Sequence, residues 1–370
     1  MIEISRYEVQ GGVSEYHVMI HVDNPRLAYA EQVKFVLSAY TQLLEGELKG
    51  AVTVLKRFFL SDAANQSDYL QTLLVEQEAC PLSIVEQSPL NGTKIALWAY
   101  LQKGVELKAL SHGMYEVKHG AYRHLWMAGA CHETSDAEAQ TRQLFDDYIT
   151  LLREQGCTLA ENCLRTWFFV QNVDVNYAGV VKARNEVFAT QNLTNQTHFI
   201  ASTGIAGRHA NHQVSVLMDA YAVQGIRQEQ IRYLYAPTHL NPTYEYGVSF
   251  ERGTAVDYGD RRQVFISGTA SINNKGEVVH PGDICNQTLR MWENVEVLLA
   301  EAECTFEHVS HLIVYLRDVA DYIVVKEMFD ERFPNIPKVY LLAPVCRPGW
   351  LIEMECMAVK TIHNERFPAY

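Results

Sequence analysis

Hydrophobic and polar residues follow the same order three times along this chain. In the middle of the sequence, apolar side chains between positions 141 and 152 recur at intervals of three and four residues, which predicts an amphipathic helix. Residues 164–170 (LRTWFFV) combine β-branched and aromatic side chains and predict a strand. A second helix is expected over 177–188. Helix, strand and helix therefore form the basic pattern of this part of the chain.

The same pattern recurs on both sides. Towards the C-terminus we expect a helix over about 284–299, a strand over 312–316, and a helix that carries Val325, Met328 and Phe329. In the first third we expect a helix over 33–44, a strand over 52–60 and a helix over about 67–75. Each copy also opens and closes with an apolar strand. The opening strands are 16–20, 123–127 and 263–267, and the closing strands are 94–99, 214–219 and 351–355.

The order strand, helix, strand, helix, strand implies a mixed sheet with both helices packed on one face. We therefore predict an α+β fold built from three tandem units, which span residues 1–110, 111–224 and 225–370. A longer stretch, from about 223 to 260, separates the second unit from the third. Any α/β protein alternates strands with helices, but here the order and the lengths of all five elements recur, which favours a repeat.

Composition and charge narrow the class of protein. The chain has 370 residues, more than one ordinary core needs, and its 48% hydrophobic and 20% charged residues are typical of a globular protein. A net charge of −13 is the wrong sign for binding nucleic acid. There is no apolar run long enough to cross a membrane and no signal-peptide pattern at residues 1–5, and the eight cysteines form no C-x-x-C pair. We expect a cytoplasmic protein with reduced thiols.

The third unit carries a specific resemblance. Residues 265–270 (FISGTA), 280–283 (HPGD) and 352–355 (IEME) resemble the opening strand, the entry to the first helix and the closing strand of the YjgF/YER057c/UK114 (RidA) family. Members of that family are homotrimers with a site in each cleft between subunits. The resemblance implies that three RidA-like units on one chain form an intrachain pseudo-trimer, whose three clefts are no longer equivalent.

A narrower likeness covers residues 249–359. The segments 249–252 (SFER), 267–272 (SGTASI) and 198–205 (HFIASTGI), together with Cys346 and Arg347 before Glu353, resemble the chorismatases. These enzymes have the same fold and split chorismate into pyruvate and a cyclic acid. The likeness implies an enzyme that cleaves the enolpyruvyl ether of chorismate to pyruvate plus a hydroxybenzoate or a dihydroxycyclohexadiene carboxylate. Cys346 matches a cysteine of the hydroxybenzoate-forming members, which would favour an aromatic product.

This reaction needs a proton donor and cations for two carboxylates. Under the resemblance Glu353 is the acid and Cys346 a second catalytic residue, while Arg252 and Arg347 bind substrate, with Arg208 of the second unit as a further candidate. Alternation along a strand places Glu353 and Glu355 on one face. The matching positions of the other units are expected at Ile95 and Leu217, so only one cleft would be equipped. A Glu353 that merely forms an ordinary salt bridge is the alternative.

Lys338 stands fifteen residues before Glu353, where RidA proteins carry the arginine used in imine hydrolysis. We assign it to substrate binding, although a lysine lacks the planar, two-pronged contact of an arginine, which makes imine deamination doubtful. A Rid-type enamine or imine hydrolase and a non-catalytic small-molecule binder remain the alternatives. We expect a small anionic carboxylate substrate, no cofactor, no metal, no nucleic acid or membrane partner, and a monomer or small homo-oligomer.

Overall fold

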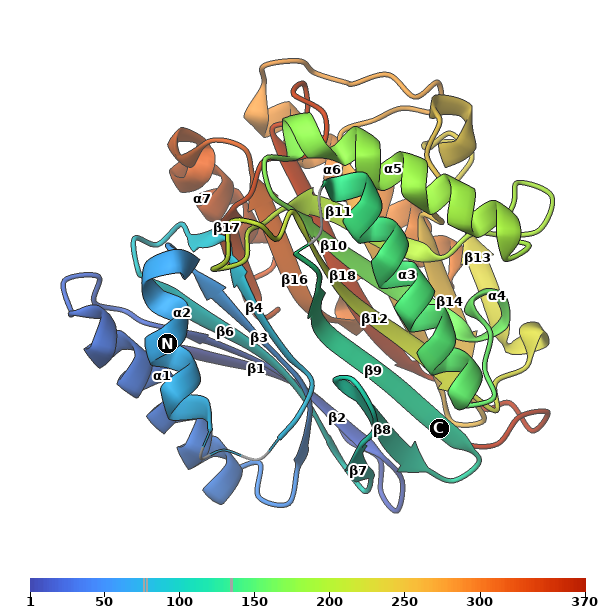
Figure 1. The fold of residues 1–370 in the computed structure, drawn as a ribbon, viewed down its shortest axis with the longest axis horizontal. Helices are drawn as coiled ribbons and strands as arrows, with labels where there is room; N and C mark the ends of the chain where they lie inside the picture. Colours follow the sequence, from blue (N-terminus) through green and yellow to red (C-terminus); the bar gives the residue numbers. More distant parts are fainter. Residues whose placement is uncertain (76, 78, 134–135) are drawn as a thin grey trace.

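The computed structural model of the chain describes residues 1–75, 77, 79–133 and 136–370. Three mixed β-sheets meet at the centre of the molecule, and the long helices lie on their outer faces (Figure 1). The predicted α+β fold of three tandem units, each with two helices on one face of a mixed sheet, is confirmed.

The first sheet has the strand order β1-β2-β6-β3-β4. Its elements are β1 (Ile2–Tyr7), β2 (Ser14–His21), α1 (Tyr29–Glu45), β3 (Val52–Leu60), α2 (Ala63–Leu74), β4 (Leu82–Glu86) and β6 (Ile95–Lys103). The short strand β5 (Ser88–Pro89) pairs instead with the third sheet.

The second sheet has the order β11-β10-β12-β9-β8-β7. Its elements are β7 (Glu106–Ala109), β8 (Met114–His119), β9 (Tyr122–Cys131), α3 (Ala137–Glu154), α4 (Leu159–Asn162), β10 (Cys163–Val170), α5 (Val173–Thr190), β11 (Ala201–Ala206) and β12 (Val216–Gln224). The sheet thus begins at Glu106, inside the segment that the sequence assigns to the first unit, because β7 pairs with β8.

The third sheet has the order β13-β14-β15-β18-β16-β17-β5. Its elements are β13 (Ile231–Leu234), β14 (Gly253–Asp257), β15 (Arg261–Ala270), α6 (Ile284–Glu301), β16 (Val309–Leu316), α7 (Tyr322–Arg332), β17 (Lys338–Leu342) and β18 (Ile352–Thr361). Short 3₁₀ turns lie at Gln228–Gln230, Thr243–Tyr246, Phe306–His308 and Val319–Asp321.

Each unit contains a parallel strand that the sequence analysis does not predict, and the antiparallel strands β1, β7, β8, β13 and β14 are likewise not predicted. After the second helix, β4, β11 and β17 pair in parallel with β3, β10 and β16. These strands are short, and β11 (ASTGIA) is made largely of small and polar residues, so it lacks the β-branched and aromatic composition that marks a strand. The parallel strand matters because it forms the edge by which each unit meets the next.

Main-chain contacts at these edges join the units in a ring. Glu86 pairs with Arg208 between the first and second units, and Ile205 pairs with Val345 between the second and third. β5 pairs with β17 between the third unit and the first. We call these contacts the first, second and third seams. The chain therefore closes on itself around a pseudo-threefold axis.

The centre of the ring is apolar but contains buried charges. One hydrophobic cluster includes residues of all three sheets, among them Trp98, Trp167 and Ile313. Within it, Arg57 of β3 donates to Asp219 of β12 at 2.7 Å, and Arg165 of β10 donates to Glu355 of β18 at 2.6 Å. Each ion pair joins two units, so removing one partner would leave a charge unpaired in the core.

The register of the strands corrects the position in the first unit that was expected to correspond to Glu353. Glu353 lies opposite Tyr315, and the matching pairs in the other units are Leu217 with Phe169 and Ala96 with Phe59. Ala96, rather than Ile95, is therefore the first unit's counterpart of Glu353.

None of the helices in the part of the chain that the structure describes is long and apolar enough to span a membrane.

Buried histidines predict that the protein loses stability in mild acid. Burial lowers the pKa of His17 and of His124 to about 3, and it also lowers the pKa of His311. In the unfolded chain the pKa of a histidine is about 6.5. The unfolded state therefore binds protons that the folded state does not. Stability from this source is complete above about pH 6.5 and is lost as the pH falls towards 3.

We expect the free energy of unfolding to fall by about 1.4 kcal/mol per pH unit for each of these histidines. Urea denaturation from about pH 7 to 5 measures the slope. His124→Gln should reduce it by about one histidine's share, whereas His363→Gln, at an exposed position, should leave it unchanged. Titratable groups that the wild type and the variants share contribute equally to each slope, so the difference between the slopes reports the substituted histidine. An unchanged slope in His124→Gln would contradict the assignment.

Candidate functional site

A cavity of about 300 Å³ lies at the second seam. The second unit contributes one face of α5 and the strand β11, and the third unit contributes β15, β18, the segment 246–252 and the loop before β18. We call it the seam cavity. Its polar lining residues are Tyr177, Arg184, Ser202, Tyr246, Arg252, Cys346, Arg347 and Glu353.

Glu353 reaches the cavity because of the pleat of β18. Ile352 and Met354 point to the opposite face of the strand from Glu353 and Glu355. The pairing of β15 with β18 shifts register between Ile266 and Thr269, as a β-bulge does. Gly268 lies in this irregular stretch, and a side chain there would overlap the Glu353 carboxyl group. The bulge and the glycine together make room for the acid.

The surroundings of Glu353 keep its carboxyl group protonated. Burial, and after it the charge of Glu355, raise the pKa of Glu353 to about 8 against the opposing effects of Arg165 and Arg252. Its carboxyl group receives no hydrogen bond from the described residues. A carboxylic acid that holds its proton at neutral pH is suited to general acid catalysis.

Arg252 and Arg347 both line the seam cavity, as the sequence predicts for substrate-binding residues. Arg252 is buried and donates through Nη2 to the carbonyl oxygen of Asn241 at 3.0 Å, while its Nε has no partner among the described residues. The guanidinium group of Arg347 lies 4.4 Å from the ring of Tyr246 and 4.9 Å from that of Trp350. Aromatic and main-chain contacts thus hold both cations in place, and Arg252 keeps its Nε free of any partner among the described residues.

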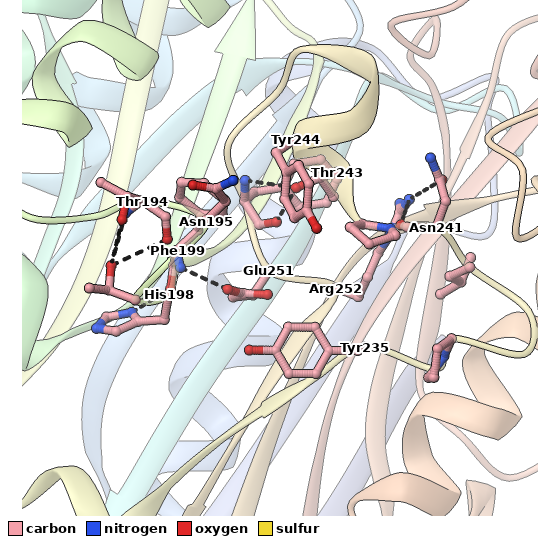
Figure 2. Close-up of a pocket in the computed structure, with 15 residues that line it drawn as sticks. Thr194, Asn195, His198, Phe199, Tyr235, Asn241, Thr243, Tyr244, Glu251 and Arg252 are labelled. Carbon is pink, nitrogen blue, oxygen red and sulfur yellow. Dashed lines mark hydrogen bonds between the residues drawn. The ribbon is translucent and has the colours of Figure 1, made fainter.

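Figure 2 shows a second, smaller cavity, of about 80 Å³, which shares Arg252 and Phe250 with the seam cavity. Glu251 points away from Arg252 and accepts a hydrogen bond from the main-chain nitrogen of Phe199 at 2.7 Å. Burial raises the pKa of Glu251, while this hydrogen bond lowers it. Glu251 therefore links the second unit to the third beside the seam cavity.

Arg184 is a candidate functional residue that the sequence analysis does not identify. It lies on α5, is 1% exposed, and its Nε and Nη2 have no hydrogen-bond partner among the residues that the structure describes. Because an unpaired buried charge is costly, these donors indicate an anion-binding position. A signal was present in the sequence: Arg184 falls within the apolar stripe formed by Val180, Val187 and Phe188.

Cys346 and Tyr177 line the same cavity. Burial raises the pKa of the Cys346 thiol to about 12, and burial also raises the pKa of Tyr177. Both groups are therefore neutral at physiological pH. Cys346 is placed to contact a ligand as a neutral thiol rather than to act as a thiolate nucleophile.

The structure corrects the expected positions of Arg208 and Lys338, neither of which lines the seam cavity. Arg208 has an exposed side chain at the first seam, 3.7 Å from Glu86. Lys338 lies on β17 at the third seam, where its Nζ donates to the carbonyl oxygen of Phe333 at 2.9 Å. The parallel strand of each unit faces the following unit, so the seam cavity receives Ser202 of β11 at the position that corresponds to Lys338.

The other two seams differ from the second. At the first seam, the carbonyl oxygen of Leu82 packs so closely on Gly129 that a side chain at that glycine would meet it at 2.7 Å. The third seam has a cavity of about 310 Å³. There, Ala96 occupies the strand position that corresponds to Glu353. Among the described residues at the three equivalent positions, Glu353 is the only acid.

No group of three or more described His, Cys, Asp or Glu side chains is arranged to hold a metal ion.

Comparison with known proteins agrees with this architecture. A family model described as endoribonuclease L-PSP matches residues 253–360. A RutC family protein of Pyrococcus abyssi is 35% identical over 100 residues, which cover 26% of this chain and 78% of the relative. The 3-aminoacrylate deaminase RutC of Acinetobacter baylyi is 31% identical over 97 residues, which cover 26% of this chain and 77% of the relative.

A solved structure matches most of the chain. The crystal structure of a chorismatase superposes with a TM-score of 0.65 at 20% identity and covers 83% of this chain and 92% of its own. This likeness is one of fold, and it extends over all three units rather than the third alone. The resemblance that the sequence motifs indicate is thereby confirmed at the level of the fold.

The close fit around Gly268 generates a prediction about stability. Gly268→Ala should lower the free energy of unfolding by about 1–3 kcal/mol, because the added methyl group would overlap the Glu353 carboxyl group and lie 3.1 Å from Thr203 Cγ2. Urea denaturation measures the change. Gly349→Ala is the matched control, since its new methyl group would lie 3.4 Å from Val278, an ordinary contact. Equal losses in the two variants would contradict the proposed fit.

Proposed function

Because this chain belongs to the endoribonuclease L-PSP (YjgF/RidA) family, we propose that it is an enzyme whose active site is the seam cavity. The reaction we propose is cleavage of the enolpyruvyl ether of chorismate, or of a closely similar cyclic dicarboxylate, to pyruvate and a cyclic acid. One observation carries the proposal: the buried carboxyl group of Glu353, whose pKa is raised to about 8, shares a cavity with three arginines, and two of these, Arg184 and Arg252, have buried donors without a partner among the described residues.

The charge of the cavity supports a dianionic substrate. With Glu353 protonated and Cys346 neutral, the charges left in the lining are the guanidinium groups of Arg184, Arg252 and Arg347. Guanidinium groups bind carboxylates through paired hydrogen bonds. Two carboxylates would neutralise most of this charge and satisfy the free Nε of Arg252 and the free Nε and Nη2 of Arg184.

The shape of the cavity supports a small cyclic substrate. A volume of about 300 Å³ suits a compact ligand, and the rings of Phe250, Tyr246 and Trp350 give it apolar walls. Such walls exclude water from the carboxyl group of Glu353 and strengthen the electrostatic contacts inside.

The proposed chemistry uses the proton of Glu353. Glu353 donates it to the methylene carbon of the enol ether, which gives an oxocarbenium-like carbon and leaves Glu353 as a carboxylate. Water adds to that carbon and returns a proton to Glu353, and the hemiketal then breaks its C–O bond to give pyruvate and the ring alcohol. If the ring loses a hydroxyl group and a proton along the way, an aromatic product results. Cys346 and Tyr177 would contact the ring at that stage.

A second candidate is supported by the similarity to the 3-aminoacrylate deaminase RutC. An enamine is also protonated at carbon before hydrolysis, so Glu353 could act on an amino analogue. Lys338, which stands at the place of the RidA arginine, lies at the third seam and outside the seam cavity, which weighs against this reaction. Incubation with 3-aminoacrylate and measurement of ammonia release discriminates the two reactions.

The acid role of Glu353 predicts the effect of its removal. We expect the protein to release pyruvate from chorismate, and Glu353→Gln to lower kcat by at least about 100-fold, because the amide cannot donate the proton. A coupled lactate dehydrogenase assay measures pyruvate, and urea denaturation of the variant checks its fold. Absence of pyruvate from the wild type would remove chorismate as substrate, and full activity in the variant would reassign the acid.

Arg184 should act on substrate affinity. We expect Arg184→Met to raise KM for chorismate by about 10- to 100-fold, the size of a lost charged hydrogen bond. Arg208→Met is the matched control, since Arg208 lies at an exposed position outside the seam cavity and should leave KM unchanged. A KM in Arg184→Met equal to that of the wild type would remove Arg184 from the substrate site.

A further inference from the structure

We infer that Glu355 is a positioning residue whose fixed negative charge keeps the neighbouring Glu353 protonated, so that the proton needed for the reaction is present at neutral pH. This inference rests on the proposed function of Glu353 as the acid. It assigns a role to a residue that does not line the seam cavity and does not touch the substrate.

Glu355 forms a buried ion pair with Arg165 and accepts hydrogen bonds from donors on three strands. Its Oε2 accepts from Arg165 Nη2 at 2.6 Å and from the hydroxyl group of Thr203. Its Oε1 accepts from Trp167 Nε1 at 3.0 Å and from the hydroxyl group of Tyr315 at 3.2 Å. Hydrogen bonds to a carboxylate stabilise its charged form. Both carboxylate oxygens of Glu355 are thus occupied by donors.

Glu353 has the opposite environment two residues away. It lies on the same face of β18, so the two carboxyl groups are neighbours. No hydrogen bond reaches its carboxyl group from the residues that the structure describes. Two close carboxyl groups in a dry site share a single proton, because both cannot be charged together without a large penalty. The proton therefore resides on Glu353, the group without donors.

The cations near Glu353 oppose its protonation. Arg165 and Arg252 act electrostatically to favour the ionised form of Glu353, while burial and the negative charge of Glu355 raise its pKa. Arg184 and Arg347, which line the same cavity, carry the same sign of charge as Arg252. Glu355 supplies its negative charge from outside the cavity lining, so the cavity arginines remain available for a substrate.

The remaining titratable groups that face Glu353 are neutral. Tyr315 on β16 and Tyr177 on α5 are buried, which raises the pKa of each phenol. Cys346 in the loop before β18 is a neutral thiol for the same reason. None of these groups supplies a negative charge at neutral pH. Of the described groups that face Glu353, Glu355 alone offsets the arginines, and its ion pair with Arg165 ties this effect to the second unit.

The test measures the protonation of Glu353 directly. Infrared difference spectra of the protein, with Glu353→Gln as the reference, report the carbonyl stretch of the protonated acid as a function of pH, without any substrate. We expect Glu355→Gln to lower the pKa of Glu353 by about one to three pH units, and the basic limb of kcat/KM for chorismate to move by the same amount. Glu355→Asp keeps the charge and should restore a profile close to that of the wild type.

A second variant covers the case in which Glu355→Gln does not fold, since it leaves Arg165 unpaired in the core. Arg165→Gln with Glu355→Gln replaces the ion pair by two amides of similar size, which the core tolerates better. The pKa of Glu353 should again fall, because Glu355 influences it more strongly than Arg165 does. A carboxyl titration unchanged in whichever of these variants folds overturns the inference.

The two readouts separate this inference from the proposed function. If the infrared titration shifts as expected but the wild type releases no pyruvate, the role of Glu355 stands and the proposed reaction falls. If the wild type cleaves chorismate and Glu355→Gln leaves both profiles in place, the proposed reaction stands and the role of Glu355 falls.

Discussion

The buried ion pair between Arg165 and Glu355 is the interaction on which the rest of the structure depends. The two side chains come from different units and are almost completely removed from water, so each charge needs the other. Their alignment fixes β10 of the second unit against β18 of the third. Both charges of the pair also act on the pKa of Glu353, two residues from Glu355 on the same strand. Packing, electrostatics and the candidate chemistry are therefore determined at one contact.

A tandem arrangement allows that contact to differ from its counterparts. In a trimer of identical chains every seam would carry the same residues. Here the strand position of Glu353 is occupied by Leu217 at the first seam and by Ala96 at the third. Leu82 closes on Gly129 at the first seam, while the second seam stays open and gathers three arginines. The second seam thus differs from the other two in combining an acid at this strand position with arginines in one cavity.

Much of the fold could be predicted because the relevant signals are local. The apolar periodicity of the helices and the composition of the long strands gave the order of elements in all three units. The parallel strands β4, β11 and β17 could not be recognised, since they are short and one of them is largely small and polar. Within the site, alternation along β18 placed Glu353 and Glu355 on one face, and motif likeness indicated Arg252, Arg347 and Cys346.

What the sequence by itself determined is the unit: its helices, its long strands and the strand face that carries Glu353. Only the tertiary structure shows which units pack against each other at each seam. As a result of this packing, Arg184 of α5 lines the seam cavity, whereas Lys338 and Arg208 lie at other seams. The physical reason is range. Periodicity and propensity act over a few residues, whereas the pairing of sheet edges and of buried charges joins positions more than a hundred residues apart, whose proximity no local pattern records.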